Sequence, residues 1–248
     1  MMDKKRIAEW FLRTATRNYT AAVILAAGNS TRMGKDVNKQ LELIDDVPVL
    51  AHTLMAYQKC ALIREIVVVA QPKDFDTVYR MRKAYGIRKM THIVAGGATR
   101  QESARNGMSK LSEKVSYVAI ADGARCLITP EQVAKVCLRA YRYQAASAAH
   151  QISDTVKRTN AVGMSLETLD RTRLWQAQTP QVFHHSLYVA AMARAQKDNF
   201  QATDDNALVE HLGYQVRMVE CGCENIKITT PEDLLLAQAL FACRRQQK

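Results

Sequence analysis

Short apolar runs alternate with amphipathic stretches along most of the chain. Three of these runs, 21–27, 65–70 and 117–121, are apolar at successive positions, which is typical of strands buried on both faces of a parallel sheet. The stretches between them repeat apolar residues at helical spacing. This alternation predicts an α/β fold: a Rossmann-like, mostly parallel sheet with helices on both faces. Further strands are expected at 92–95, 145–150 and 215–220, and helices at 48–60, 74–85, 100–111, 130–143, 185–195 and 203–212.

Two helix starts carry clear capping signals. Thr230-Pro231-Glu232-Asp233 places a cap, a first-turn proline and two acids in order, and so predicts the last helix. Thr203 is expected to cap the helix before it, with Asp204 and Asp205 in the first turn.

The pattern breaks between Ile152 and Thr172. Polar and apolar residues alternate near Thr155–Lys157, and a polar turn follows near Asn160, which predicts a β-hairpin arm at about 151–173 that projects from the body. A projecting hairpin is poorly stable alone, so we expect it to pack on something, often a second subunit.

The chain before the first strand reads as a separate extension. Ile7, Trp10, Phe11 and Thr14 fall at helical spacing, which fits a short amphipathic helix that serves packing or, alternatively, attachment to a membrane surface. This stretch lacks the apolar core of a signal peptide, and no run is long enough to cross a bilayer, so a cytoplasmic protein is expected. We therefore expect an extension over residues 1–20 and a single domain over residues 21–248.

The net charge indicates which class of ligand to expect, and the cysteine spacing indicates the state of the thiols. The formal net charge of +11 suits anions, but the basic residues are spread without interleaved aromatics, so small phosphorylated molecules fit better than nucleic acid. The six cysteines are scattered, which favours free thiols in a reducing compartment over a zinc site.

The stretch after the first strand carries the most distinctive chemistry. Gly28, Asn29, Ser30 and Thr31 form a small-residue turn, followed by three cations: Arg32, Lys35 and Lys39. Such a turn lets backbone N–H groups approach a polyanion, so it predicts a triphosphate cradle; the alternative is an ordinary βα turn with solvated charges. Ligands of parallel sheets bind outside the carboxyl ends of the strands. The other predicted strand ends are at Gln71, Gly96-Gly97 and Asp122.

Seven separate stretches together resemble one family. They are LAAGNSTRMG with Lys39-Gln40, GGATRQES, ADGAR, SDTVKR, LDRTRLWQAQTPQVF, TDDNALVE and NIKITTPEDL, in the order and spacing of that family. On these motifs the chain resembles the 2-C-methyl-D-erythritol 4-phosphate cytidylyltransferases. The resemblance implies a nucleotidyltransferase-type fold, transfer of CMP from CTP to methylerythritol phosphate, and a homodimer whose active sites are shared through the arm.

The resemblance also implies roles for individual residues. Three cations, Arg32, Lys39 and Lys227, match those that contact the CTP phosphates or the reacting phosphoryl group. The nucleotide side comprises Ala26, Ala27, Gly28, Asn29, Ser30, Gly97, Arg100, Ser103 and Asp122, with Gly97 and Ser103 in the segment that reads cytosine. The side that binds methylerythritol phosphate comprises Arg125, Arg171, Thr179 and Thr203, with Arg171 on the arm that crosses to the other subunit.

The same resemblance implies Mg²⁺ bound mainly through the CTP phosphates, with Asp122 as an indirect contact. None of the six histidines falls in a matching motif, so each is expected to be structural. Two alternatives remain open at this point: a ribitol-5-phosphate cytidylyltransferase, which shares the Thr-Pro-Gln and Asn-Ile-Lys segments, and a catalytically silent nucleotide-binding regulator.

Three positions depart from the family pattern. Gly123 and Cys126 stand where the family usually has alanine and proline, and Ala98 stands where it often has aspartate. The glycine and the missing proline are expected to loosen the turn after Asp122.

Overall fold

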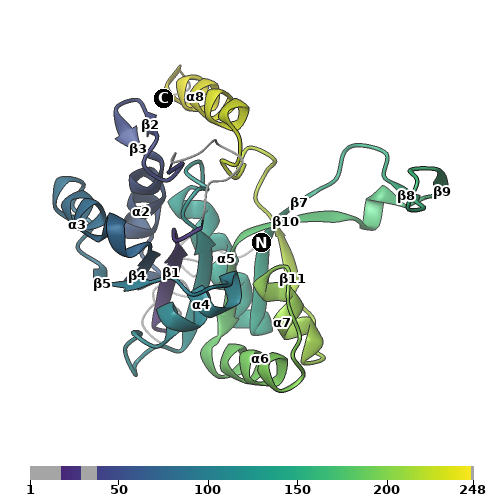
Figure 1. The fold of residues 1–248 in the computed structure, drawn as a ribbon, viewed down its shortest axis with the longest axis horizontal. Coiled ribbons are helices and arrows are strands. Elements are labelled where there is room, and N and C mark those ends of the chain that lie inside the picture. The colour runs from purple at the N-terminus through teal and green to yellow at the C-terminus, as the bar shows by residue number, and fades with distance from the viewer. Residues whose placement is uncertain (1–17, 29–37, 247–248) are drawn as a thin grey trace, which may run out of the picture.

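A seven-stranded sheet runs through the centre of the computed structural model, which describes residues 18–28 and 38–246 (Figure 1). The strand order is β11-β7-β10-β6-β1-β4-β5. Only β10 among these strands is antiparallel to its neighbours, so the prediction of a mostly parallel sheet is confirmed. The strands are β1 (Thr20–Leu25), β4 (Ile63–Ala70), β5 (Met90–Ala95), β6 (Tyr117–Asp122), β7 (Ala145–Gln151), β10 (Trp175–His184) and β11 (Arg217–Glu220).

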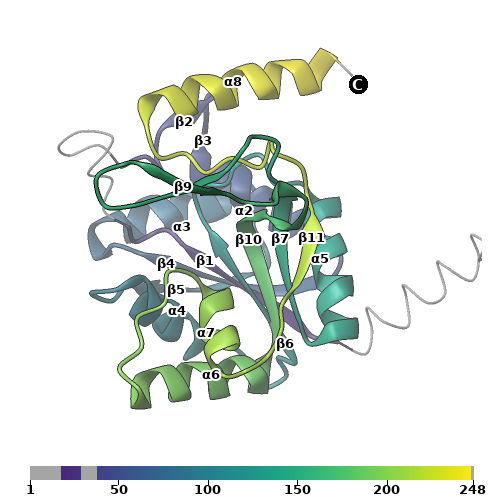
Figure 2. The ribbon, with the colours of Figure 1, turned by 90° about the vertical axis from the view of Figure 1, so that its right-hand side faces the viewer.

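Helices cover both faces of this sheet, as the alternating pattern predicted (Figure 2). Side chains of a strand alternate between faces. Accordingly, Ile24 of β1 packs in the cluster that includes α2, α3 and α5, whereas Val23 packs with residues of α4, α6 and α7. The helices are α2 (Val49–Lys59), α3 (Phe75–Ala84), α4 (Arg100–Met108), α5 (Pro130–Tyr143), α6 (His185–Lys197), α7 (Asp205–His211) and α8 (Pro231–Gln246).

The capping signals were right for α8 and wrong by one residue for α7. At α8, Asp233 Oδ2 accepts from the Thr230 N–H at 2.9 Å, and Thr230 Oγ1 accepts in return at 3.4 Å. The cap of α7 is Asp204, not Thr203: its Oδ1 accepts from the Ala207 N–H at 3.0 Å. Gln181 of β10 donates to the other oxygen of Asp204 at 2.7 Å, so a contact with the sheet fixes this residue as the cap.

A small hairpin that the sequence analysis did not predict lies beneath α8. Its strands are β2 (Leu43–Ile44) and β3 (Val47–Pro48), and the turn residues Asp45 and Asp46 have φ of 51° and 60°. Aspartate tolerates this left-handed backbone better than most residues. Ile44 packs with Ile228 and Ala237 of the α8 region in a separate apolar cluster at this end of the molecule.

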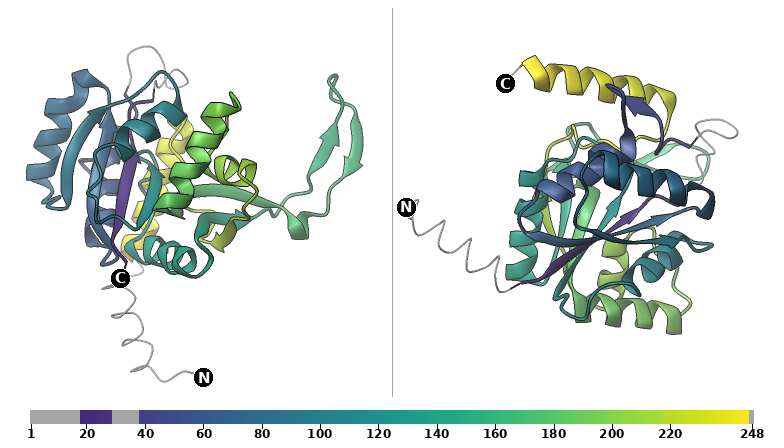
Figure 3. Two further views of the ribbon diagram at one scale, coloured as in Figure 1. Left: turned by 90° about the horizontal axis from the view of Figure 1, so that it is seen from below. Right: turned by 90° about the vertical axis from the view of Figure 1, so that its left-hand side faces the viewer.

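The predicted arm is present and projects away from the body (Figures 1 and 3). Its strands are β8 (Lys157–Thr159) and β9 (Ser165–Thr168), and a short 3₁₀ helix, η3 (Arg171–Arg173), follows them. Asn160 Oδ1 accepts from the N–H groups of Val162 and Met164, which forms the polar turn. At the base, Gln151 of β7 pairs with Trp175 of β10, so the arm leaves and rejoins the sheet between neighbouring strands.

Two further expectations can be compared with the structure. All six cysteines are free thiols, as expected, and four of them are buried. Within residues 18–28 and 38–246, no helix has the length and apolar character that crossing a membrane requires. The N-terminal helix predicted from Ile7, Trp10, Phe11 and Thr14 lies outside the described residues.

Candidate active site

The strand ends singled out from the sequence meet at one cleft of about 470 Å³. It opens at the carboxyl ends of β1, β4, β5 and β6, which is where parallel sheets bind ligands. Gly28, Gln71, Gly96, Gly97 and Asp122 all line it. Its lining also includes Lys39 and Gln40, which follow β1, and Lys227, which precedes α8.

Glycines let two of the turns come close together on one side of this cleft. A Cβ at Gly96 would lie 2.4 Å from the Cβ of Ala27, and a Cβ at Gly97 would lie 2.3 Å from that of Glu102. The Gly97 N–H donates to Ser103 Oγ at 3.0 Å, and the Ala98 N–H donates to Glu102 Oε2 at 2.7 Å. The turn after β5 is therefore held against the first turn of α4.

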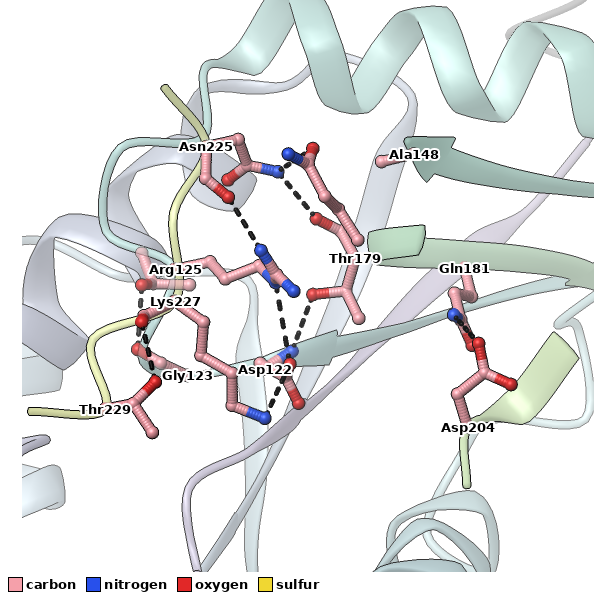
Figure 4. A network of polar contacts seen from close by, with 12 residues as sticks. Asp122, Gly123, Arg125, Ala148, Thr179, Gln181, Asp204, Asn225, Lys227 and Thr229 are labelled. Atoms are coloured by element: carbon pink, nitrogen blue, oxygen red, sulfur yellow. Dashed lines mark hydrogen bonds and ion pairs between the residues drawn. The ribbon is translucent and has the colours of Figure 1, made fainter. Parts of the chain in front are cut away.

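Asp122, at the end of β6, lies among three cations, Lys227, Arg125 and Arg100, of which Figure 4 shows the first two. Its Oδ2 lies 3.0 Å from Lys227 Nζ and 3.5 Å from Arg125 Nε, and its Oδ1 lies 3.8 Å from Arg100 Nε. These cations come from the segment before α8, the turn after β6 and the start of α4. Chain segments far apart in the sequence thus bring positive charge to one point of the cleft.

The cations around Asp122 favour the charged form of its carboxyl group. Burial would raise the pKa of the Asp122 carboxyl, but Lys227, Arg100 and Arg125 together hold that pKa below its usual value. Burial lowers the pKa of Arg125, and Asp122 opposes this only in part. Burial would also lower the pKa of Arg100, but the carboxylates of Asp205 and Asp122 raise it instead. Asp122 is therefore ionised near neutral pH and paired with cations.

Hydrogen bonds from β10 and from the segment before α8 fix this arrangement (Figure 4). The Asp122 N–H donates to Thr179 Oγ1 at 3.0 Å, and Arg125 Nη1 donates to the Asn225 carbonyl at 2.7 Å. The Asn225 side-chain amide in turn donates to the Thr179 carbonyl at 3.1 Å and to Gln178 Oε1 at 3.0 Å. Asn225 is completely buried, so it joins the two segments inside the protein.

Most of the site residues predicted from the sequence come together here. Arg125 and Thr179 contact Asp122, and Ala26 lies at the end of β1, where its N–H donates to the Val69 carbonyl at 2.7 Å. Arg32, Asn29 and Ser30 lie outside the described residues. The predicted residues that line the cleft are Ala27, Gly28, Lys39, Gly97, Arg100, Ser103, Asp122 and Lys227.

Besides Ala26, Arg125 and Thr179, two further predicted residues, Arg171 and Thr203, are not among the described residues that line the cleft. Arg171 lies on the arm, in a separate recess of about 340 Å³, and its Nη1 donates to the Ser153 carbonyl. Thr203 is exposed and immediately precedes the cap of α7.

The turn after Asp122 is well fixed, contrary to the expectation from Gly123 and Cys126. The Gly123 N–H donates to the Leu25 carbonyl at 2.8 Å, and its carbonyl accepts from Thr53 Oγ1 at 2.8 Å. Cys126 is buried in the apolar cluster beneath α8. A Cβ at Gly123 would lie 2.8 Å from Gln40 Oε1, so the glycine lets the Gln40 side chain approach the strand end.

Sequence reasoning missed two residues of this region. Gln40 lines the cleft beside Lys39, and Asp205 lies 2.7 Å from Arg100 Nη1. Both occur in motifs quoted above, but only their position in the fold shows what they contact.

The donor set around the cleft is cationic rather than metal-chelating. In the part of the chain that the structure describes, no group of three or more histidine, cysteine or acidic side chains is placed to hold a metal ion. Asp122 is the one carboxylate among the described lining residues, and none of the six histidines lines the cleft.

Comparisons with known proteins agree on one family. The family model described as 2-C-methyl-D-erythritol 4-phosphate cytidylyltransferase matches residues 20–243. A protein of that name from Syntrophus aciditrophicus is 44% identical over 221 residues, which are 89% of this chain and 94% of the relative. Another from Caldanaerobacter subterraneus subsp. tengcongensis is 42% identical over 220 residues, 88% of this chain and 96% of the relative.

Solved structures show the same likeness. The 4-diphosphocytidyl-2C-methyl-D-erythritol synthase of Anaerococcus prevotii superposes with a TM-score of 0.83 at 26% identity, covering 93% of this chain and 99% of the other. The 2-C-methyl-D-erythritol 4-phosphate cytidylyltransferase of Thermus thermophilus gives a TM-score of 0.72 at 29% identity, covering 90% of this chain and 98% of the other. The chain belongs to the 2-C-methyl-D-erythritol 4-phosphate cytidylyltransferase family.

Proposed function

We propose that this protein transfers CMP from CTP to 2-C-methyl-D-erythritol 4-phosphate, releasing pyrophosphate and forming 4-diphosphocytidyl-2-C-methyl-D-erythritol. Family membership gives the reaction. The observation that supports it in this chain is the cleft at the strand ends, whose lining includes the three cations Lys39, Lys227 and Arg100.

The reaction is an in-line displacement at the α-phosphorus of CTP. A phosphate oxygen of the methylerythritol phosphate forms the new P–O bond, and the bond to the pyrophosphate oxygen breaks. Because the nucleophile is already ionised near neutral pH, the site needs no general base. Both reactants are anions, so the protein must align them and compensate their charge.

Each side of the cleft has its own task in this proposal. Lys39 and Lys227, together with Arg32, contact the phosphates. The turn predicted at 26–30 and the segment 96–98, with Arg100 and Ser103, hold the nucleotide. Asp122 holds Lys227 at 3.0 Å, which keeps the ammonium group at the place where the reacting phosphates meet.

The methylerythritol phosphate binds on the side of Arg125, Thr179 and Thr203, and Arg171 comes from the arm of a second subunit. Arg171 lies outside the cleft of its own chain, so it needs a partner to act there. The arm also exposes three large apolar side chains, Val162, Met164 and Leu166, with Val162 82% exposed. A monomer would leave this apolar surface in water, which supports a homodimer.

Mg²⁺ would be carried by the CTP phosphates rather than by a protein cage. One cleft carboxylate with three cations around it fits a metal that keeps phosphate and water ligands, with Asp122 as the residue that would meet it through water. Bound Mg²⁺ supplies additional positive charge to the triphosphate. We place the reaction in the cytoplasm, which the six free thiols support.

Pyrophosphate release from each nucleoside triphosphate in turn, with methylerythritol phosphate present, tests the proposal. Release from CTP alone of the four is the expected result. Release with ribitol 5-phosphate but not with methylerythritol phosphate would instead identify a ribitol-5-phosphate cytidylyltransferase. CTP binding without any pyrophosphate release would identify a silent regulator.

A further inference from the structure

A second buried acid stands behind the cation cluster of the cleft. Asp205 is the first residue of α7 and is completely buried. Its Oδ2 lies 2.7 Å from Arg100 Nη1, and its Oδ1 accepts a hydrogen bond from the Tyr188 hydroxyl at 2.6 Å. Tyr188 lies on α6 and is also completely buried. The acid is therefore fixed on one side by a tyrosine and faces the cleft only through Arg100.

Arg100 connects this acid to the centre of the site. Its guanidinium lies between Asp205 and Asp122, with Nε 3.8 Å from Asp122 Oδ1. Lys227 contacts the other oxygen of the same carboxylate, at 3.0 Å from Oδ2. Arg100 and Lys227 thus share the charge of Asp122 from its two sides.

This sharing affects the cation that the proposed reaction needs. Charges in a partly buried site interact more strongly than in water. If Arg100 were released from Asp122, the carboxylate would be left with less positive charge at Oδ1 and would hold Lys227 more tightly. Less of the Lys227 charge would then be available to the reacting phosphates.

We propose that Asp205 is a positioning residue for the transfer reaction, which acts through Arg100 by holding its guanidinium against Asp122. This inference rests on the proposed function of the cleft. Tyr188 contributes to the same positioning of Arg100, because its hydroxyl fixes the carboxylate of Asp205.

The test is a double-mutant cycle on kcat and KM with CTP and methylerythritol phosphate. Asp205→Asn keeps the shape and an acceptor for Tyr188 but removes the charge that holds Arg100. We expect it to lower kcat by about tenfold or more, with KM for methylerythritol phosphate changed by less than about threefold. Arg100→Gln should lower kcat as well, and the double variant should lower it no further than Arg100→Gln alone, because Asp205 acts only through that side chain.

A matched tyrosine pair separates this role from loss of stability. Tyr188→Phe removes one hydroxyl hydrogen bond of 2.6 Å, and so does Tyr141→Phe, whose bond goes to Thr20 at the start of β1, the end opposite the cleft. Only Tyr188→Phe should lower kcat. If Asp205→Asn fails to fold, this pair carries the test.

Two outcomes would overturn the inference: additive losses of kcat in the cycle, or equal kcat for the two tyrosine variants. Either of them, in an enzyme whose wild type is active, leaves the proposed function intact. A wild-type protein that releases no pyrophosphate from CTP with either polyol phosphate would refute the proposed function, and the inference with it.

Discussion

Lys227 Nζ lies 3.0 Å from Asp122 Oδ2, at the end of the strand β6. The lysine is still 38% exposed, so the carboxylate orients its ammonium group without removing it from the cleft. A cation held in this way does not have to be reoriented when the anionic substrates bind, which is the basis of electrostatic preorganisation.

Removing either lysine of the cleft should slow the reaction strongly. We expect Lys39→Ala and Lys227→Ala each to lower kcat by at least about a hundredfold, the usual loss for a preorganised electrostatic contact. Lys114→Ala, at an exposed position in the loop before β6, is the control and should leave kcat unchanged. Steady-state kinetics near wild type for both cleft variants would remove these residues from the mechanism.

Mixing two inactive variants tests whether Arg171 acts across a dimer. The Arg171→Ala and Lys227→Ala subunits are mixed in equal amounts, unfolded together and refolded. In the mixed dimers that form, one of the two sites has both residues intact. We expect about a quarter of the wild-type activity to return, as random pairing in a two-fold dimer gives. Failure of the mixture to exceed its two components would place Arg171 in its own chain or outside the site.

Acid should erase the stabilising effect of the Asp122 charge. Lys227, Arg100 and Arg125 hold the pKa of this buried carboxyl below its unfolded value of about 3.9. The charge therefore contributes stability above that value, and this contribution is lost as the pH falls through the lowered pKa. We expect Asp122→Asn to be less stable at pH 7 on the order of 1–3 kcal/mol, a figure reduced because Lys227 and Arg100 are partly exposed.

Urea unfolding of both proteins from pH 7 down to about pH 3 measures this difference. It should shrink on acidification below about pH 4. A difference that stays constant or grows would show that the carboxylate is not stabilised by its cations.

Thiol reactivity should divide the cysteines into two classes. Cys223 and Cys243 are exposed, whereas burial raises the pKa of Cys126 to about 12 and that of Cys221 to about 11. Thiolates are the reactive form. In the native protein at pH 8, two thiols should react quickly with Ellman's reagent, and the other four should react only after denaturation. Rapid labelling of Cys126, identified by mass spectrometry, would show that the turn after Asp122 opens readily.

Sequence signals predicted helices and strands well where residues that are close together in the chain determine them. The start of α5 is an example: the helix was expected from Pro130, and in the structure Thr129 accepts from the Gln132 N–H while the Gln132 side chain accepts from the Thr129 N–H. The strand ends that form the cleft were also predicted, because apolar runs that stop at glycine or aspartate are readable in sequence.

Features decided by contacts between distant segments could not be read in this way. The antiparallel direction of β10 depends on its pairing with β6 and β7, and its register shifts between Ala177 and Gln181. Asp204 became the cap of α7 instead of Thr203 because Gln181 of β10 holds it. The pairing of Arg100 with Asp205 joins the starts of two helices that only the fold brings together.

The arm leaves the sheet and returns to it at residues that are paired with each other. Gln151 faces Trp175 at its base, and the Ile152 N–H donates to the Leu174 carbonyl at 3.2 Å, so the chain re-enters the sheet where it left. Insertions or deletions between these points would alter neither the strand order nor the four strand ends around the cleft. The segment proposed to select the sugar phosphate can therefore diversify in evolution while the nucleotide half stays unchanged.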